Sequence, residues 1–100
     1  KPKHQARVFL APLGEVAKKK ALSLFEQFRQ ENIRCMEAFS KDALKAQLGI
    51  ADKYSVDYAL ILGQREVLDG TIIIRNMKTA KQETVKLAKV VQEVKKKLKK

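Results

Sequence analysis

A chain of 100 residues with 45% apolar and 33% charged residues has the composition of one globular domain, which excludes a disordered chain and a multidomain protein. Lysine and arginine outnumber aspartate and glutamate by 22 to 11, and the net charge of +11 favours a polyanionic partner such as a nucleic acid, although lysine-rich surfaces also serve solubility alone. A single cysteine, Cys35, excludes an internal disulfide, and with His4 as the only histidine no zinc site is expected.

The first part of the chain predicts a strand followed by a helix. Residues 1–6 (KPKHQA) are polar and include a proline, which is typical of a linker, and the start at Lys1 suggests a piece cut from a longer protein. The apolar run 7–11 predicts a buried strand that Pro12 ends. Over residues 15–32, apolar side chains recur at helical spacing and predict one buried face: Ala17, Ala21, Leu24, Phe25 and Phe28.

A second strand and a second helix are expected next. Residues 33–39 (IRCMEAF) have the length and composition of a strand. Ser40 is a suitable helix N-cap, and Asp42 would place negative charge in the first turn, where the helix dipole favours it. The helix is predicted to end near Tyr54, with a buried stripe formed by Leu44, Leu48 and Ala51.

The second half of the chain predicts a hairpin and a last helix. Residues 58–62 (YALIL) are apolar throughout, which is typical of a central strand covered on both faces. Asp69-Gly70 is a strong signal for a tight turn, so residues 71–77 are predicted to return as the partner strand. Residues 83–98 predict a helix with one buried face, made of Leu87, Val91, Val94 and Leu98. The order of elements predicts a mostly parallel sheet with helices on it and an antiparallel hairpin at one edge.

Two residues of the predicted hairpin are candidates for contacts with bases. Glu66 and Arg75 would lie on adjacent strands if the hairpin is in register. An arginine can donate two parallel hydrogen bonds to a guanine edge, and a carboxylate accepts from an amino group of a base. The same spacing is equally consistent with a cross-strand ion pair worth less than about 1 kcal/mol. The lysine runs 18–20 and 95–100 would add salt-dependent attraction to phosphate without reading sequence.

Catalytic chemistry has little support in these residues. The segment 13–15 has one glycine, whereas phosphate-binding loops need two or three. No serine has a histidine partner outside the N-terminal stretch, and Cys35 lies in a predicted strand, where a structural role is more common than a reactive one. We therefore expect no active site within this chain.

The stretch 57–82 (DYALILGQREVLDGTIIIRNMKTAKQ) resembles the C-terminal anticodon-binding domain of class IIa aminoacyl-tRNA synthetases. The family pattern is an apolar strand, a glycine, a glutamate three residues later, a turn that ends in glycine and a strand that ends in a basic residue, here Gly63, Glu66, Gly70 and Arg75. Residues 78–82 (KTAKQ) and 44–53 (LKAQLGIADK) are similar to the histidyl branch, and 7–33 fits the opening of the domain. The sequence departs from the pattern at Ser55-Val56 and Ala80, where the family usually has glycine.

This resemblance implies a three-layer α/β fold over residues 7–98, followed by a basic tail, 99–100. The sheet would be mixed, mostly parallel and five-stranded, with an antiparallel hairpin edge and three flanking helices. By the same resemblance, six residues would contact the anticodon: Glu66 and Arg75 as readers of bases, Lys78 and Gln82 on the following loop, and Leu13 and Gly14 through their backbone.

The resemblance also implies a partner and a parent protein. The partner would be a tRNA specific for histidine, and the domain itself would need no cofactor or metal. The parent would be a cytoplasmic, homodimeric histidine–tRNA ligase whose catalytic core uses ATP and Mg, whereas the isolated domain would be a monomer without contact to a membrane. An alternative is a regulatory or interaction module that uses the same fold, as in stress-sensing kinases and polymerase accessory subunits.

Overall fold

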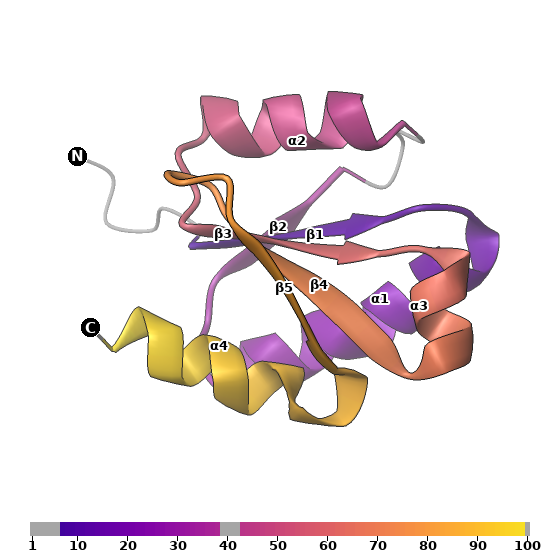
Figure 1. Ribbon diagram of the computed structural model, residues 1–100. Helices are drawn as coiled ribbons and strands as arrows, with labels where there is room; N and C mark the ends of the chain where they lie inside the picture. The colour runs from indigo at the N-terminus through magenta and orange to yellow at the C-terminus, as the bar shows by residue number, and fades with distance from the viewer. Residues whose placement is uncertain (1–6, 39–42, 100) are drawn as a thin grey trace.

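The computed structural model describes residues 7–38 and 43–99, which form three layers (Figure 1). A five-stranded sheet lies in the middle, with helix α2 (Leu44–Lys53) on one face and helices α1 (Glu15–Gln30) and α4 (Val90–Leu98) on the other. A shorter helix, α3 (Gln64–Asp69), lies at one end of the sheet. The arrangement confirms the predicted three-layer α/β fold with a mixed sheet.

The strands run in the spatial order β2-β1-β3-β4-β5. They are β1 (Val8–Pro12), β2 (Cys35–Glu37), β3 (Tyr58–Leu62), β4 (Thr71–Asn76) and β5 (Gln82–Lys86). Strand β1 pairs in parallel with β2 and β3, whereas β4 pairs antiparallel with β3 and β5. The antiparallel edge is therefore confirmed, but parallel and antiparallel pairings are equally frequent, so the sheet is less parallel than expected.

Alternate residues of the strands face the two helical layers. In β1, Val8 and Leu10 belong to the cluster formed with α1 and α4, whereas Phe9 and Ala11 belong to the cluster beside α2. All four side chains are at most 1% exposed, because this central strand is covered on both faces. The sheet is thus fixed from both sides along β1 and β3.

Helix α1 buries the face that its sequence periodicity predicts, whereas α2 buries Gln47 with Ala51 and α4 buries Val90 with Val94, so their predicted stripes are only partly confirmed. In α1, the side chains of Ala17, Ala21, Leu24 and Phe28 are at most 2% exposed, while Phe25 is half-buried. Helix α1 ends at Gln30, two residues before the predicted end, and Asn32 follows in a left-handed conformation with φ 61°. The predicted linker 1–6, the N-cap Ser40 and Asp42 lie outside the described residues.

The predicted hairpin turn at Asp69-Gly70 is wrong, because residues 64–69 form helix α3. Gly63 is extended and starts the helix, and its N–H donates to the Glu66 side chain, Oε1 at 2.8 Å. Gly70 ends the helix in a left-handed conformation with φ 71°, which glycine adopts without steric strain. Strands β3 and β4 still pair antiparallel, but they are joined by a helix and not by a two-residue turn.

The predicted start of the last helix at residue 83 is also wrong. Residues Gln82–Lys86 form β5, which pairs with β4 in the hairpin at the sheet edge. Val85 faces the cluster beneath α1 and α4, while the other residues of this edge strand are exposed. A 3-10 turn, Leu87–Lys89, leads into α4, whose Val90 and Val94 are fully buried.

Candidate nucleic-acid interface

The six predicted contact residues form two groups at opposite ends of the sheet. Arg75 pairs with Ala59 near the start of β3, whereas Glu66 lies in α3, beyond the end of β3 at Leu62. Three residue steps from Ala59 to Leu62 span about 10 Å at the usual rise of a strand. The expectation that Glu66 and Arg75 lie side by side on a hairpin is therefore wrong.

The first group is centred on Arg75 and Gln82, which are directly opposite each other on β4 and β5. The Arg75 guanidinium donates through Nη1 to the Gln82 side-chain oxygen at 2.9 Å. The Nε of Arg75 is buried and has no acceptor among the described residues. A buried donor without an acceptor is unfavourable by about 1–3 kcal/mol and is uncommon in folded proteins.

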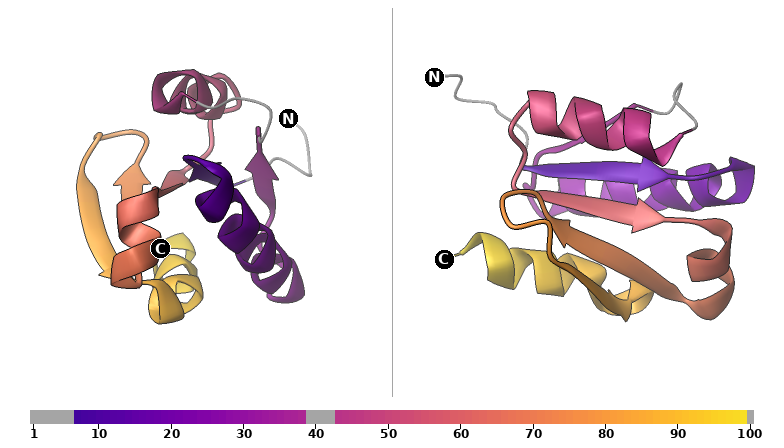
Figure 2. Two further views of the ribbon diagram at one scale, coloured as in Figure 1. Left: turned by 90° about the vertical axis from the view of Figure 1, so that its right-hand side faces the viewer. Right: turned by 45° about the horizontal axis from the view of Figure 1, so that its top comes forward.

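This pair lies on a part of the sheet that α2 does not cover. Side chains of cross-strand partners lie on the same face of a sheet. The face that α2 partly covers therefore carries four residues of β4 and β5: Ile73, Arg75, Gln82 and Thr84. Figure 2 shows α2 over the middle of the sheet, with β4 and β5 extending beyond it. We call Ile73, Arg75, Gln82 and Thr84 the open face; its β5 residues are exposed and its β4 residues half-buried.

Lys78 lies in the turn that joins β4 to β5, next to the open face. The Asn76 side-chain oxygen accepts from the backbone N–H of Lys78 at 2.9 Å and of Thr79 at 3.1 Å, which fixes the turn. Ala80 adopts a left-handed conformation with φ 65°, although it is not a glycine. The turn thus keeps the backbone shape that a glycine at this position would favour.

The second group is at the carboxyl ends of β1 and β3. The Leu13 N–H donates to the Leu62 carbonyl at 2.9 Å, which brings the end of β1 against Gly63. Glu66 is half-buried here, and its carboxylate accepts from the N–H of Gly63 at 2.8 Å. A Cβ at residue 63 would come within 2.7 Å of Glu66 Oε1. A glycine followed three residues later by glutamate is the signal by which the sequence indicates this helix cap.

We expect Glu66→Ala to destabilise the domain by about 1 kcal/mol, because the Gly63 N–H loses its acceptor and α3 loses its N-terminal cap. Glu66→Gln keeps an acceptor oxygen and should change the free energy of unfolding by less than half as much. Urea denaturation of both variants measures the difference. Equal stability of Glu66→Ala and wild type would contradict the capping role.

A buried polar residue that the sequence interpretation missed lies near the second group. Gln47 of α2 is 0% exposed, and its Nε2 donates to the Pro12 carbonyl at 2.8 Å, while its Oε1 has no partner among the described residues. The contact ties α2 to the end of β1. The polar residue sits within an otherwise apolar stripe, so periodicity alone does not mark it as buried.

Three other features were considered in the part of the chain that the structure describes: a reactive cysteine, a metal site and a membrane-spanning helix. Burial raises the pKa of the Cys35 thiol to about 12, so the thiol is protonated and unreactive near neutral pH. Residues 7–38 and 43–99 contain no group of three or more histidine, cysteine, aspartate or glutamate side chains arranged to hold a metal. None of the helices described here is both long and apolar enough to span a bilayer.

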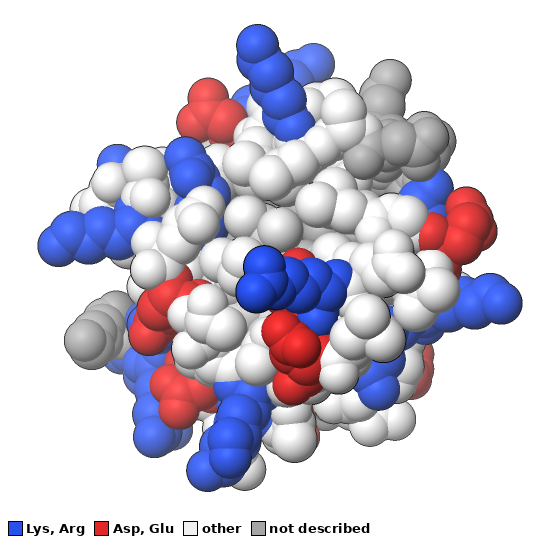
Figure 3. Space-filling model, turned by 45° about the vertical axis from the view of Figure 1, so that its right-hand side comes forward, with Lys and Arg blue, Asp and Glu red and all other residues white. Residues whose placement is uncertain are grey.

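Two lysines near the C-terminus form ion pairs with neighbouring elements. Lys95 forms an ion pair with Glu31 at 2.7 Å, and Lys97 pairs with Glu83 while lying 5.9 Å from the centre of the Tyr58 ring. On the face shown in Figure 3, basic and acidic side chains are interspersed around uncharged surface. The positive charge is thus not gathered into one patch on this face.

Comparisons with known proteins identify the family of this chain. A family described as "Anticodon binding domain" matches residues 7–97. A histidine–tRNA ligase of Dehalococcoides mccartyi is 36% identical over 91 residues, and one of Rhodococcus jostii is 39% identical over 90 residues. These alignments cover 91% and 90% of this chain but 22% and 21% of the relatives, so the chain spans about a fifth of their length.

Solved structures show the same fold. The histidyl-tRNA synthetase of Nostoc sp. PCC 7120 superposes with a TM-score of 0.86 at 24% identity, over 94% of this chain and 23% of that one. The apo enzyme of S. aureus gives 0.83 at 23% identity, over 91% and 27%. Because the family match extends over nearly all of the described residues, the chain belongs to the anticodon-binding domain family.

Proposed function

We propose that this chain is the tRNA anticodon recognition domain of a histidine–tRNA ligase. It would hold the anticodon stem-loop of a histidine tRNA while a catalytic core, outside this chain, uses ATP and Mg to charge that tRNA. The parent would act in the cytoplasm as a homodimer. The support is the family match together with relatives that are histidine–tRNA ligases and about five times longer than this chain.

The observation that carries this proposal is the guanidinium of Arg75. It belongs to the open face, and its Nη1 donates to the Gln82 side-chain oxygen at 2.9 Å. Its Nε is buried and closed to a base, so a base would be contacted through the terminal nitrogens. A guanine edge offers two acceptors, O6 and N7, in the geometry that an arginine fork matches. The histidine anticodon contains two guanines, and unpaired bases of an RNA loop can be turned outward to such a donor.

The other predicted contacts take separate roles in this proposal. Lys78, in the turn beside the open face, would neutralise a phosphate of the loop. Glu66, Leu13 and Gly14 would contact a second, unstacked base at the other end of β3, because the two groups are too far apart to read one base. The Glu66 carboxylate would then accept from an amino group while it also caps α3.

Binding of RNA stem-loops to this chain tests the proposal. We expect a stem-loop with the histidine anticodon to bind about tenfold more tightly than the same stem-loop with both guanines replaced by adenine. Fluorescence anisotropy at fixed ionic strength measures the ratio, since affinities for RNA depend strongly on salt. Equal affinity for the two loops would refute anticodon recognition and would favour the alternative of a general RNA-binding or regulatory module.

A further inference from the structure

The buried amide of Gln47 is not explained by the stability of the domain. The side chain is 0% exposed, its Nε2 donates to the Pro12 carbonyl at 2.8 Å, and its Oε1 has no partner among the described residues. Gln47→Met, which keeps a side chain of similar length, would exchange one buried unpaired acceptor, Oε1, for another, the Pro12 carbonyl. Because the balance of unpaired groups is the same in both cases, stability gives little reason for an amide here. Polar residues of this kind are commonly kept for function.

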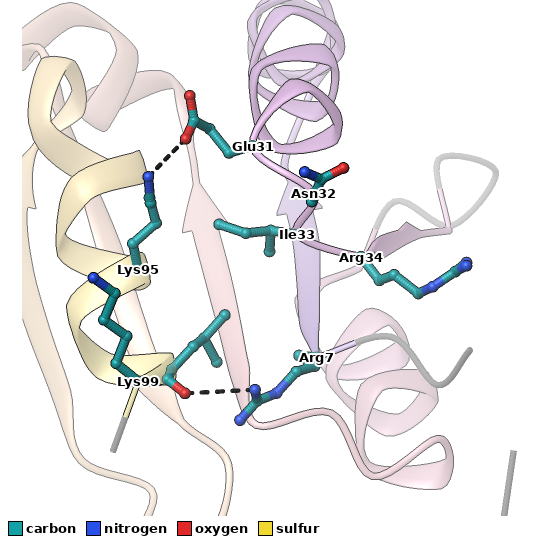
Figure 4. Close-up of a pocket in the computed structure, with 8 residues that line it drawn as sticks. Arg7, Glu31, Asn32, Ile33, Arg34, Lys95 and Lys99 are labelled. Atoms are coloured by element: carbon teal, nitrogen blue, oxygen red, sulfur yellow. Dashed lines mark hydrogen bonds and ion pairs between the residues drawn. The ribbon is translucent and has the colours of Figure 1, made fainter. Parts of the chain in front are cut away.

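The hollow between the ends of α1 and α4 shows the more usual state of polar side chains in this protein. Figure 4 shows the Lys95 ammonium bonded there to the Glu31 carboxylate, at 2.7 Å. Among residues 7–38 and 43–99, two buried side-chain atoms lack a hydrogen-bond partner: Arg75 Nε and Gln47 Oε1. Arg75 has a part in the proposed function, whereas Gln47 does not. We therefore ask which contacts of Gln47 lead to the candidate interface.

Gln47 holds one peptide group at the end of β1. The carbonyl of Pro12 and the N–H of Leu13 belong to the same planar peptide unit. Gln47 donates to the carbonyl at 2.8 Å, and the Leu62 carbonyl accepts from the N–H at 2.9 Å. The unit is thus attached to α2 through one polar atom and to β3 through the other, and the Pro12 ring fixes the φ torsion before it. Its orientation determines the direction in which the chain leaves β1 for Gly14.

The turn that follows this peptide group has few contacts of its own. Gly14 is exposed with φ 91°, and among the described residues no atom beyond its chain neighbours lies within 4 Å of the position of a Cβ there. Glycine can adopt several backbone conformations at such a position. Leu13 Cδ1 and Glu66 Oε1 lie 3.9 and 2.7 Å from the position that a Cβ of Gly63 would occupy. The orientation of the peptide that joins Pro12 to Leu13 therefore sets where Leu13 and Gly14 lie relative to Glu66.

We propose that Gln47 is a positioning residue for RNA recognition, which holds the backbone of Leu13 and Gly14 in the orientation that contacts the second base. This inference rests on the proposed function, in which Leu13, Gly14 and Glu66 contact that base. Gln47 does not touch the RNA itself, because its side chain is fully buried beneath α2. Loss of its hydrogen bond should therefore affect recognition at one anticodon position and leave the contacts of Arg75 intact.

RNA binding by Gln47→Met tests this role, with stem-loops in which each anticodon position is altered in turn. We expect the variant to lower discrimination by about fivefold at one position, different from the position that Arg75→Ala affects. The midpoint of urea denaturation should change little, because one unpaired acceptor replaces another. Leu48→Met, in a half-buried residue of the same helix, is the matched control and should leave every ratio unchanged. Gln47→Leu, which also removes the donor, should reproduce the effect with a side chain of another shape.

Amide hydrogen exchange tests the positioning without RNA. In Gln47→Met the Leu13 amide, which is bonded to the Leu62 carbonyl, should exchange about tenfold faster than in the wild type. The amide of Leu60, in the middle of β3, should exchange at the same rate in both proteins. Unchanged exchange at Leu13, unchanged discrimination, or a loss at the position that Arg75→Ala affects would overturn the inference. Absence of discrimination in the wild type would refute the proposed function and the role in recognition with it, while the Leu13 rate would still decide whether Gln47 orients the turn.

Discussion

Arg75→Ala is expected to weaken binding of the histidine anticodon stem-loop by about 10- to 100-fold and to remove the preference for guanine at one position. The substitution deletes the only side chain of the open face that can donate two parallel hydrogen bonds to a guanine edge. It also removes the buried Nε–H that lacks an acceptor in the described residues, so stability should change little. Anisotropy titrations with cognate and guanine-to-adenine loops measure both effects.

Two control variants separate base reading from simple charge. Arg75→Lys keeps the charge but not the planar fork, and it should lose most of the discrimination while retaining part of the affinity. Arg65→Ala removes an arginine from α3 whose side chain is 89% exposed and 3.9 Å from Asp69, and it should leave discrimination unchanged. If Arg65→Ala and Arg75→Ala weaken both loops by the same factor, Arg75 contributes charge only and is not a reader.

The parts of the fold that the sequence predicts well are those whose pattern follows from burial alone. Leu24 and Phe28 belong to a stripe with the period of a helix, and this period predicts the helix. The continuous apolar run of β3 likewise predicts a buried strand. Helix α3 was missed because Asp69-Gly70 is equally suited to a hairpin turn and to the end of a helix. The glycine and glutamate at its start, Gly63 and Glu66, favour the helix.

The residues alone do not indicate strand β5, although the resemblance implies a fifth strand, and the physical reason is a different one. Strand β5 is an edge strand with one inward residue, Val85, and four exposed polar residues, so its sequence has too few apolar positions to show a period of two. Backbone pairing with β4 holds these residues in a strand, although their own sequence does not favour one. Such tertiary pairing commonly overrides intrinsic propensity in strands.

That the six candidate residues contact RNA stays a prediction, and their expected arrangement is wrong for Glu66 and Arg75. Both Glu66 and Arg75 lie at the surface near strand ends, yet the helix between β3 and β4 places them at opposite ends of the sheet. The number of residues between Glu66 and Arg75 determines the distance between them only if the structure of the connecting segment is known. The contact between Arg75 and Gln82 follows from the register of β5, which the resemblance implied as a strand but the residues alone did not indicate.

Leu24→Ala should have the largest effect on stability, a loss of about 2–5 kcal/mol in the free energy of unfolding. Leu24 is 2% exposed in α1 and belongs to the cluster that holds α1 and α4 against the sheet. Truncation leaves a cavity that this close-packed layer cannot readily fill. Since domains of this size are stable by about 5–15 kcal/mol, a large share of the stability would be lost.

Leu22→Ala in the same helix is the matched control, because it deletes the same atoms from a side chain that is 58% exposed. We expect a change of at most about 0.5 kcal/mol. Urea denaturation of both variants compares the two sites.

At temperatures where Leu24→Ala remains folded, its ratio of affinities for cognate and altered loops should equal that of the wild type, because the open face lies on the opposite side of the sheet from Leu24. A changed ratio would mean that packing under α1 also sets the position of Arg75, and similar losses of stability for the two leucines would contradict the layered core.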